Sequence, residues 1–441
     1  MEKIVSLCKR RGFVWQGSEI YGGVGAVWHF GPLGVEMKNA IKRHWWATFV
    51  YRREDVVGTE GAVIMHPRVW EASGHLQSFT DPLVECKKCH LRFREDQLEG
   101  KDLTCEKGGK HEFTEAKPFN LMFKTYLGPV EDKASLTYLR PETAQSMFTD
   151  FKLILESSRQ KVPFGIAQIG KSFRNEITTG DFFFRVREFE LAEIEYFVKP
   201  ENIEKGADEK AFDEWFALWK KFYTDLGINK NKLREYEHPG KSLAHYSKRT
   251  VDIEYEFPFG WGELAGVANR TDYDLKRHME FSGRDLHYFD EQTKEKYVPY
   301  VIEPTLGIER VMLAALIDGY QESDGADGRE KGEVVIRLHP TIAPVQIACF
   351  PLVKKDKLPE IARKIRNQLS EKRLRGFYDE AGSIGRRYRR QDEIGTPWCI
   401  TVDFETLKDN SVTVRDRDTL KQERVKIDEL DDYFFSKLNL S

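Results

Sequence analysis

The sequence predicts an α+β fold in two to three domains, and three observations carry that prediction. Residues 168–176 and 184–197 alternate charged with apolar side chains at the period of two that is typical of β-strands, and a short loop joins them. Residues 35–51 have the apolar spacing of a long amphipathic helix. Beyond about residue 340, strand and helix patterns alternate, which favours a separate α/β domain with a mixed sheet.

Composition bounds the class of protein. The 69 basic and 72 acidic residues of this 441-residue chain nearly cancel, so no net charge indicates nucleic-acid binding. No apolar run approaches the ~20 residues of a membrane span, the N-terminus lacks a signal-peptide pattern, and the six cysteines do not suggest a disulfide framework. We therefore expect a cytoplasmic enzyme or binding protein without a membrane partner.

Charge is spread unevenly along the chain. Residues 354–390 hold thirteen Lys or Arg and five Asp or Glu. Such an excess suits a surface that binds a phosphate backbone, and it is also common on a solvated helix.

The pair of strands at 168–197 has the strongest functional pattern. One face of the first strand carries Gln168, Ser172, Arg174 and Glu176, and one face of the second carries Arg185, Arg187, Phe189, Glu193 and Glu195. Because buried charges need partners, the pattern indicates either an exposed amphipathic hairpin or the floor of a site. The ligand of such a site would have a flat ring and groups of both charges.

A smaller, cysteine-containing segment interrupts the core-like sequence at residues 84–117. Cys86 and Cys89 have the spacing of half a zinc knuckle, because two thiolates two residues apart can bind one tetrahedral metal. The second half is incomplete, since Cys105 has no second Cys after it, and His90 and His111 are candidate fourth ligands. Cys86, Cys89, Cys105 and His111 would form a zinc site of three thiolates and one imidazole; the alternative is a knuckle that has lost its metal.

Further segments hold ordinary elements and one more candidate site. A Gly-rich segment spans 17–34, and Trp45 and Trp46 point to different sides of their helix. Polar side chains crowd residues 66–75, and those at the strand-to-helix junction 139–145 suggest a site more than a helix cap. Residues 227–250 are basic and contain His238 and His245. We expect strands at 56–57, 119–123, 250–257, 260–270 and 297–302. We expect helices at 203–226 and 311–317, a turn into a helix within 270–278 with Asp272 in its first turn, and a loop at 321–331.

Three stretches resemble the signature motifs of class II aminoacyl-tRNA synthetases. Residues 31–46 resemble motif 1, residues 173–176 with 185–189 resemble motif 2, and residues 307–310 resemble motif 3. Further segments narrow the resemblance to glycyl-tRNA synthetases of the homodimeric kind: 70–75, 140–145, 192–195 and 269–275. The resemblance covers essentially the whole chain.

The resemblance implies an architecture and a reaction. Residues 1–335 would form a catalytic domain with an antiparallel sheet flanked by helices, interrupted by insertions at 84–117 and about 200–250. Residues 336–441 would form an anticodon-binding domain, and the motif 1 helix would form a homodimer. The family uses ATP, with Mg²⁺, to make glycyl-adenylate and then passes glycine to tRNA(Gly).

The resemblance also assigns roles to residues. Arg174 would neutralise the α-phosphate, Glu176 would contact the adenine amine, and Phe189 and Arg310 would stack on either side of the adenine, with Arg185 near the phosphates. The ammonium of glycine would be bound by Glu142, Glu193 and Glu303. Arg270 would bind the carboxylate of glycine, and the hydroxyl of Thr305 would line the pocket.

The sequence departs from the family pattern at three places. The loop at 178–184 lacks the usual arginine, for which Lys171 or Arg185 would compensate; Ser146 replaces a glycine, and Thr305 replaces a serine. Two alternatives stay open: a tRNA-binding paralogue without catalytic activity, and activation of another small amino acid such as alanine.

Overall fold

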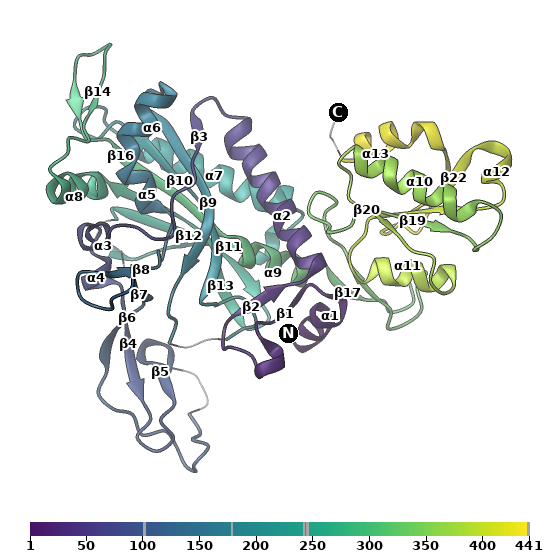
Figure 1. Cartoon of the computed structure of the whole chain (residues 1–441), viewed down its shortest axis with the longest axis horizontal. Helices are drawn as coiled ribbons and strands as arrows, with labels where there is room; N and C mark the ends of the chain where they lie inside the picture. The colour runs from purple at the N-terminus through teal and green to yellow at the C-terminus, as the bar shows by residue number, and fades with distance from the viewer. Residues whose placement is uncertain (100–102, 178–179, 241–242, 244–246, 439–441) are drawn as a thin grey trace.

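The computed structural model describes residues 1–438 except 100–102, 178–179, 241–242 and 244–246. A large N-terminal domain is built on one sheet, and a smaller C-terminal domain lies to one side of it (Figure 1). Among the described residues, no helix combines the length and the apolar character that crossing a membrane requires.

A seven-stranded sheet forms the centre of the N-terminal domain, in the order β11-β12-β13-β16-β10-β9-β3. All neighbours pair antiparallel except β3 and β9, which are parallel. The sheet is therefore predominantly antiparallel, as predicted. Its strands are β3 (Val56–Gly58), β9 (Phe164–Phe173), β10 (Glu188–Val198), β11 (Leu233–Glu237), β12 (Arg249–Phe257), β13 (Gly260–Thr271) and β16 (Tyr300–Gly307).

Helices cover the two faces of this sheet unequally. One face packs against a large core to which α2 (Pro32–Trp46), α7 (Ala207–Asp225) and α9 (Ile308–Gly319) contribute Trp45, Trp219 and Leu313. A second core lies under α5 (Ala144–Thr149), α6 (Phe151–Ser158) and α8 (Tyr273–Ser282) at the end of the other face. The rest of that second face carries the polar side chains that form the site.

The long helix predicted at 35–51 is two elements. α2 begins at Pro32, where proline suits the first helical turn, and a π-helical turn, η2 (Ala47–Tyr51), continues it. Trp45 is fully buried, and the half-buried Trp46 lies on β3, where a Cβ on Gly58 would come within 2.3 Å of its ring. Both tryptophans therefore pack within their own chain.

The two predicted strands of the hairpin are shorter at their joined ends. β9 ends at Phe173 and β10 begins at Glu188, so Arg174, Glu176 and Arg185 lie in the connection. The reason is local hydrogen bonding: the Glu176 amide turns back to the Arg174 carbonyl, and the Arg187 amide bonds the Ala26 carbonyl of the Gly-rich segment. The alternation within the strands is confirmed, because Glu193 pairs with Gln168 and Phe189 with Ser172.

Two other predictions need correction. The expected buried strand at 119–123 is only the end of β6 (Lys117–Asn120), which lies at the edge of the small sheet β5-β4-β6. The apolar run reads as a strand because Leu121 and Met122 are buried, but they follow the strand. The stretch at 200–250 is not only helical, since it also supplies β11, an edge strand of the main sheet.

The insertion at 84–117 projects from one edge of the domain (Figure 1). It is built on β4 (Thr80–Glu85), β5 (Arg92–Arg94), η3 (Glu95–Gln97) and β6. The smaller elements around the domain are α1 (Glu2–Arg11), β1 (Val14–Gln16), η1 (Glu19–Tyr21), β2 (Trp28–Phe30), α3 (Pro67–Ala72), α4 (His75–Ser78), β7 (Lys124–Tyr126), β8 (Leu136–Tyr138), η4 (Lys230–Lys232), β14 (Tyr288–Phe289), β15 (Lys296–Tyr297), β17 (Tyr320–Glu322) and β18 (Val334–Ile336).

The C-terminal domain has the predicted mixed sheet, in the order β20-β19-β21-β22-β23. β19 pairs parallel with β20 and β21, and the remaining neighbours are antiparallel. The pattern did not predict its last helix, α13 (Leu430–Leu438), whose Phe434 is buried. The other elements are β19 (Ile347–Pro351), α10 (Leu358–Glu371), β20 (Gly376–Tyr378), α11 (Ile384–Asp392), β21 (Trp398–Val402), α12 (Thr406–Asp409), β22 (Ser411–Asp416), β23 (Gln422–Lys426) and η6 (Ile427–Glu429).

Candidate active site

A row of directly paired residues crosses the polar face of the main sheet. Glu193 of β10 pairs with Thr305 of β16, Thr305 with Gly266 of β13, and Gly266 with Asp252 of β12. Because paired residues of antiparallel strands point to the same face, these side chains share one surface. Gly266 leaves an opening in the row, and a cavity lies above it.

Three glutamates line one side of this cavity: Glu142, Glu193 and Glu303. Each is at most 9 % exposed. They come from the strand-to-helix junction before α5, from β10 and from β16, so separate parts of the chain supply them. We call these three residues the glutamate cluster.

Arg270 lies beneath the glutamate cluster and is 1 % exposed. Its guanidinium makes two hydrogen bonds to Asp274, at 2.8 and 2.9 Å, and one of 2.7 Å to Glu303. Glu142 lies 3.9 Å from the same guanidinium. Arg270 was predicted to bind the carboxylate of glycine, but these carboxylates already occupy it, so the arrangement favours a role in holding them.

Glu142 is held as an ionised carboxylate. His75 Nε2 lies 3.2 Å from one of its oxygens, and Gln145 donates to the other at 2.9 Å. Burial alone would raise the pKa of Glu142, but His75 and Arg270 outweigh it and bring the pKa well below its ordinary value.

Glu193 is fixed from two sides. The Thr143 amide donates to its Oε2 at 2.8 Å, the Thr143 hydroxyl donates to the same oxygen, and the Thr305 hydroxyl donates to Oε1 at 3.3 Å. Burial and the nearby charge of Glu142 nevertheless raise the pKa of Glu193.

Glu303 and its neighbour Glu195 hold protons more tightly than ordinary glutamates. Burial raises the pKa of Glu303 to about 8, against the lowering effect of Arg270. Burial and Glu303 raise the pKa of Glu195 well above its ordinary value, and neither of its carboxyl oxygens has a hydrogen-bond partner among the described residues. The acidic side chains of this cavity outnumber its two arginines, and a ligand ammonium group would supply further positive charge.

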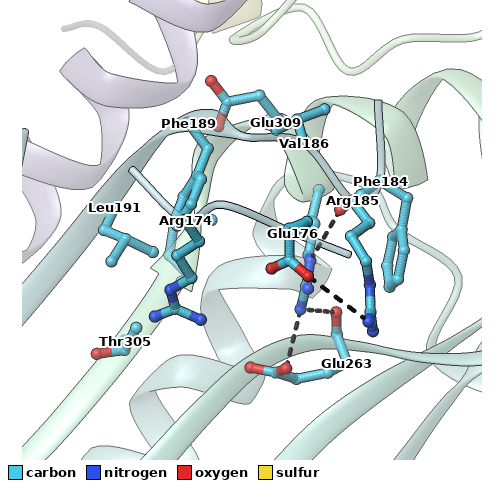
Figure 2. A pocket seen from close by; sticks show the side chains of 13 residues that line it. Arg174, Glu176, Phe184, Arg185, Val186, Phe189, Leu191, Glu263, Thr305 and Glu309 are labelled. Atoms are coloured by element: carbon cyan, nitrogen blue, oxygen red, sulfur yellow. Dashed lines mark hydrogen bonds and ion pairs between the residues drawn. The ribbon is translucent and has the colours of Figure 1, made fainter. Parts of the chain in front are cut away.

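A second pocket lies beside the first and shares Arg174, Glu263 and Thr305 with it (Figure 2). Arg174 donates to the Pro141 carbonyl at 3.1 Å, and its guanidinium lies 5.3 Å from the centre of the Phe189 ring. Arg174 therefore stands between the two pockets, with an aromatic ring at its side.

Glu176 and Arg185 point into this second pocket and toward each other (Figure 2). Their closest charged atoms are 3.9 Å apart. Glu176 Oε2 and Arg185 Nη1 are buried and lack hydrogen-bond partners among the described residues. Buried polar atoms in native proteins are nearly always paired, so both atoms are arranged for a polar ligand.

Arg310, at the start of α9, lines the same pocket. Its guanidinium lies 4.4 Å from the Phe184 ring centre, and Nη1 bonds both the carbonyl and the carboxylate of Glu263 at 2.9 Å. The pocket is thus bounded by Phe189, Phe184 and Arg310, which suits a flat ring.

The residues that depart from the family pattern, and those expected to compensate for the missing arginine, lie in different parts of the site. Lys171 is exposed and pairs with Glu188, so it is not in the pocket, whereas Arg185 is. Ser146 bonds the Thr143 carbonyl and Gln168 behind the glutamate cluster. In the altered loop, Phe183 is fully buried, and residues 178–179 lie outside the described part of the chain.

Several site residues escaped the sequence-based prediction: His75, Thr143, Phe184, Asp252, Glu263 and the role of His238. The polar crowding at 66–75 and 139–145 was the one signal for the first two. No local pattern marks the others, because each reaches the site through a strand pairing or a turn.

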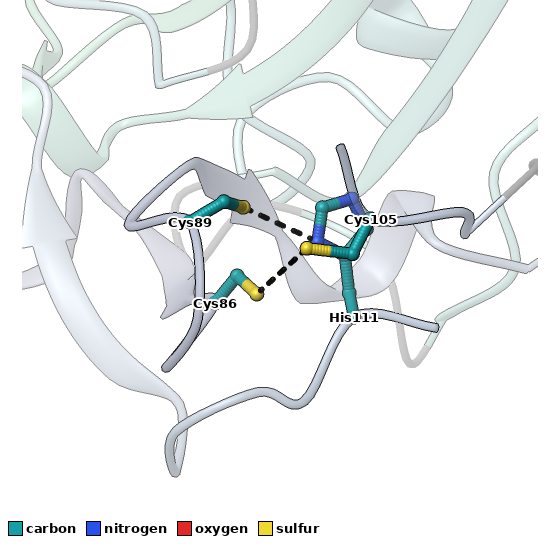
Figure 3. Close-up of side chains that lie close together, drawn as sticks. All are labelled: Cys86, Cys89, Cys105 and His111. Atoms are coloured by element: carbon teal, nitrogen blue, oxygen red, sulfur yellow. Dashed lines mark hydrogen bonds between the residues drawn. The ribbon is translucent and has the colours of Figure 1, made fainter. Parts of the chain in front are cut away.

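The predicted metal ligands converge in the insertion (Figure 3). Cys86 Sγ lies 4.0 Å from Cys105 Sγ, and Cys89 Sγ lies 3.5 Å from His111 Nδ1. All four ligand atoms are within 4.8 Å of one another. His90 instead points to Glu85, so His111 is the nitrogen donor of this set, which we call the Cys/His group.

Known families match both domains. The family described as "tRNA synthetase class II core domain (G, H, P, S and T)" matches residues 126–319. The family described as "Anticodon binding domain" matches residues 344–437.

Curated proteins named "Glycine--tRNA ligase" are similar over their full length. Those of Thermobifida fusca (strain YX) and Streptomyces coelicolor are each 53 % identical over 458 residues, covering 99 % of this chain and 98 % of each relative. That of Treponema denticola is 52 % identical over 440 residues, covering 98 % and 95 %.

Proposed function

This chain belongs to the glycine–tRNA ligases, class II synthetases that use ATP to join glycine to tRNA(Gly), and we propose how its residues divide that reaction. The observation that carries the proposal is the pair of adjoining pockets with Arg174 between them. One pocket is lined mainly by acidic side chains, and the other has aromatic walls.

The glutamate cluster binds the ammonium group of glycine. Its excess of carboxylates over cations supports this assignment, since a buried ammonium needs charged partners. Glycine has no side chain to contact, so the pocket selects it by excluding larger amino acids. Thr305 contributes to that exclusion because its hydroxyl is bonded to Glu193 and its methyl narrows the space.

Arg174 binds the negatively charged groups that react. It binds the carboxylate of glycine and the α-phosphate of ATP, and it stabilises the negative charge that develops at phosphorus while pyrophosphate leaves. Arg270 positions Glu303 and Asp274 behind the ammonium instead of meeting the glycine carboxylate.

The second pocket binds ATP. The Glu176 carboxylate, of which Oε2 makes no hydrogen bond among the described residues, accepts from the adenine amine. Phe189 and Arg310 stack on the ring, and Arg185 reaches the phosphates. Mg²⁺ accompanies the triphosphate.

The Cys/His group is a structural zinc site. In a tetrahedral site with Zn–S bonds of about 2.3 Å, sulfur atoms lie roughly 3.8 Å apart, close to the Cys86–Cys105 separation. Four protein ligands leave no open position, so zinc here would hold the insertion and take no part in the reaction.

The active protein is a homodimer through α2, and the reaction takes place in the cytoplasm. Val35 near the start of α2 and Tyr51 at the end of η2 are exposed apolar side chains, which supports an interface along these two elements. Sedimentation of the intact protein at about twice the 51.4 kDa chain mass is the expected result, and a single-chain mass would refute it.

Glycine-dependent pyrophosphate–ATP exchange tests the assignment of Arg174. Arg174→Ala should lower exchange by about 10²–10³-fold, the usual cost of a group that stabilises developing charge. Lys171→Ala removes a nearby exposed cation outside the pocket and should leave the rate unchanged. Parental exchange in Arg174→Ala would refute the assignment.

Two alternatives are resolved by the same assay. Exchange with glycine excludes a tRNA-binding paralogue without catalytic activity. Parallel reactions with alanine and serine decide whether the pocket accepts another small amino acid, and exchange with alanine at the glycine rate would overturn selection by exclusion.

A further inference from the structure

A histidine–aspartate pair lies in the glycine cavity on the side opposite the glutamate cluster. His238 and Asp252 both line this cavity. Asp252 belongs to the row that crosses the sheet, with Gly266 between it and Thr305. Since neighbouring strands are about 4.8 Å apart, the Cα atoms of Asp252 and Thr305 lie roughly 10 Å apart. The Asp252 carboxylate reaches toward the space above Gly266, where a Cβ would lie 3.1 Å from its Oδ1.

The pair is ordered by its own contacts. His238 Nε2 lies 2.7 Å from Asp252 Oδ2, and the His238 amide bonds the Thr250 carbonyl at 3.0 Å. The Tyr236 ring contacts the imidazole edge to face, with 5.0 Å between ring centres. Because the carboxylate accepts the proton of Nε2, Nδ1 of a neutral imidazole is left as a hydrogen-bond acceptor.

The assigned activation chemistry leaves this pair unused. Glycine activation employs the glutamate cluster, Arg174 and the second pocket, and neither His238 nor Asp252 lines that second pocket. The aspartate is only 9 % exposed, while the histidine side chain is 28 % exposed. An imidazole that lines a cavity and is oriented by a buried carboxylate is the arrangement of a group that takes up a proton.

We propose that His238 accepts the proton of the terminal tRNA hydroxyl in the transfer step, and that Asp252 is its positioning residue. The inference rests on the proposed function, because it needs glycyl-adenylate in the glutamate cluster. A ribose that enters over Gly266 would meet the adenylate on one side and His238 on the other.

The transfer step balances in atoms and electrons. The ribose oxygen attacks the carbonyl carbon of glycyl-adenylate, and a new ester C–O bond forms. The bond from that carbon to the phosphate oxygen breaks, and AMP leaves with the electron pair. The hydroxyl proton passes to Nδ1 of His238, from which solvent removes it.

Two measurements on the full-length protein separate transfer from activation. His238→Ala should keep glycine-dependent pyrophosphate exchange within about 2-fold of the parent. It should slow single-turnover transfer from preformed glycyl-adenylate to saturating tRNA by about 10²–10⁴-fold, the usual contribution of general base catalysis. Added imidazole should restore part of that rate, and Asp252→Asn should slow the same step.

A second histidine–aspartate pair gives a matched control. His287 Nδ1 lies 2.6 Å from Asp285, on the exposed surface, so His287→Ala should change neither rate. Transfer at the parental rate in His238→Ala, measured at saturating tRNA, would overturn the proposal, even if transfer at lower tRNA concentrations is slower. So would loss of exchange in both His238→Ala and His238→Gln, which would make the residue structural.

The same assays keep this inference apart from the proposed function. Absence of glycine exchange in the parent protein would refute the function itself. Parental exchange with parental transfer in His238→Ala would refute only the role of His238.

Discussion

The Glu303 carboxyl group is buried beside Arg270, and its protonation state bears on the proposed binding of glycine. Arg270 donates to it at 2.7 Å, yet burial raises its pKa to about 8. Without a ligand the carboxyl group therefore holds a proton at neutral pH. Binding of the glycine ammonium would favour the ionised form, so the proton must leave when glycine enters.

Glycine binding should consequently depend on pH. As the pH rises from 6 toward 8, less work is needed to ionise Glu303, and the KM for glycine in pyrophosphate exchange should fall by up to about tenfold per unit. It should level off above pH 8. Glu303→Gln keeps the acceptor for Arg270 but cannot ionise, so it should raise the KM at pH 8 by at least about tenfold.

Asp285→Asn, in the exposed pair with His287, is the control variant for this experiment and should preserve the parental pH profile. A Glu303→Gln protein with the parental slope between pH 6 and 8 would show that another group controls glycine binding.

At the scale of elements, β4 connects the Cys/His group to the ATP pocket. Cys86 follows the strand directly, and Phe79 precedes it, 5.4 Å from the Arg174 guanidinium. Asp81 of the same strand binds Arg94 of β5 at 2.8 Å. Past β6, the Leu121 carbonyl accepts the Asn175 amide of the motif 2 segment at 2.8 Å.

Loss of the metal should therefore affect ATP binding as well as stability. We expect His111→Ala to lower bound zinc from one equivalent to less than about 0.2, because a site of three thiolates without the imidazole binds far more weakly. Its KM for ATP should rise, since β4 and β6 support Arg174 and Asn175. Metal analysis, thermal unfolding and ATP-dependent exchange measure the three effects.

His90→Ala is the matched control, because His90 is an exposed neighbour of Cys89 that contacts Glu85. It should retain the metal. Zinc loss in His90→Ala with retention in His111→Ala would reverse the ligand assignment, and parental protein without zinc would show that the Cys/His group is held by packing alone.

At the scale of the whole molecule, the described chain forms two domains with separate cores. The C-terminal core surrounds its own sheet, and the basic residues 354–390 lie on α10, α11 and the segments beside them. The domains are nevertheless connected, since Arg329 of the linking segment binds Asp392 at 3.2 Å and the Arg417 carbonyl.

Charge reversal on the C-terminal surface should weaken tRNA binding and spare glycine activation. Lys364 and Arg386 are exposed, and the double variant Lys364→Glu, Arg386→Glu should raise the KM for tRNA and flatten its dependence on salt. The exchange rate should stay at the parental value. Lys210→Glu changes an exposed side chain of α7 in the other domain and is the control for added negative charge.

Equal losses of exchange and tRNA charging in the double variant would contradict this division of labour. An unchanged KM for tRNA would show that the nucleic acid binds another surface.

The sequence by itself determined the local features of this protein. Alternation predicted β9 and β10 and put Glu193 and Phe189 on one face. Apolar spacing predicted the helix α2, although its start at Pro32 precedes the predicted start at residue 35, and the cysteine spacing predicted the metal group. These properties depend on residues that are neighbours along the chain.

Only the tertiary structure decided which distant residues meet. Asp252, Gly266, Thr305 and Glu193 form one row because four strands pair in one register, and a shift of one residue would turn any of them to the other face. The contacts of Arg270 also depend on the tertiary structure, because Asp274 and Glu303, which accept its hydrogen bonds, belong to different elements. Register and burial are set by packing of the whole core, which no local pattern contains.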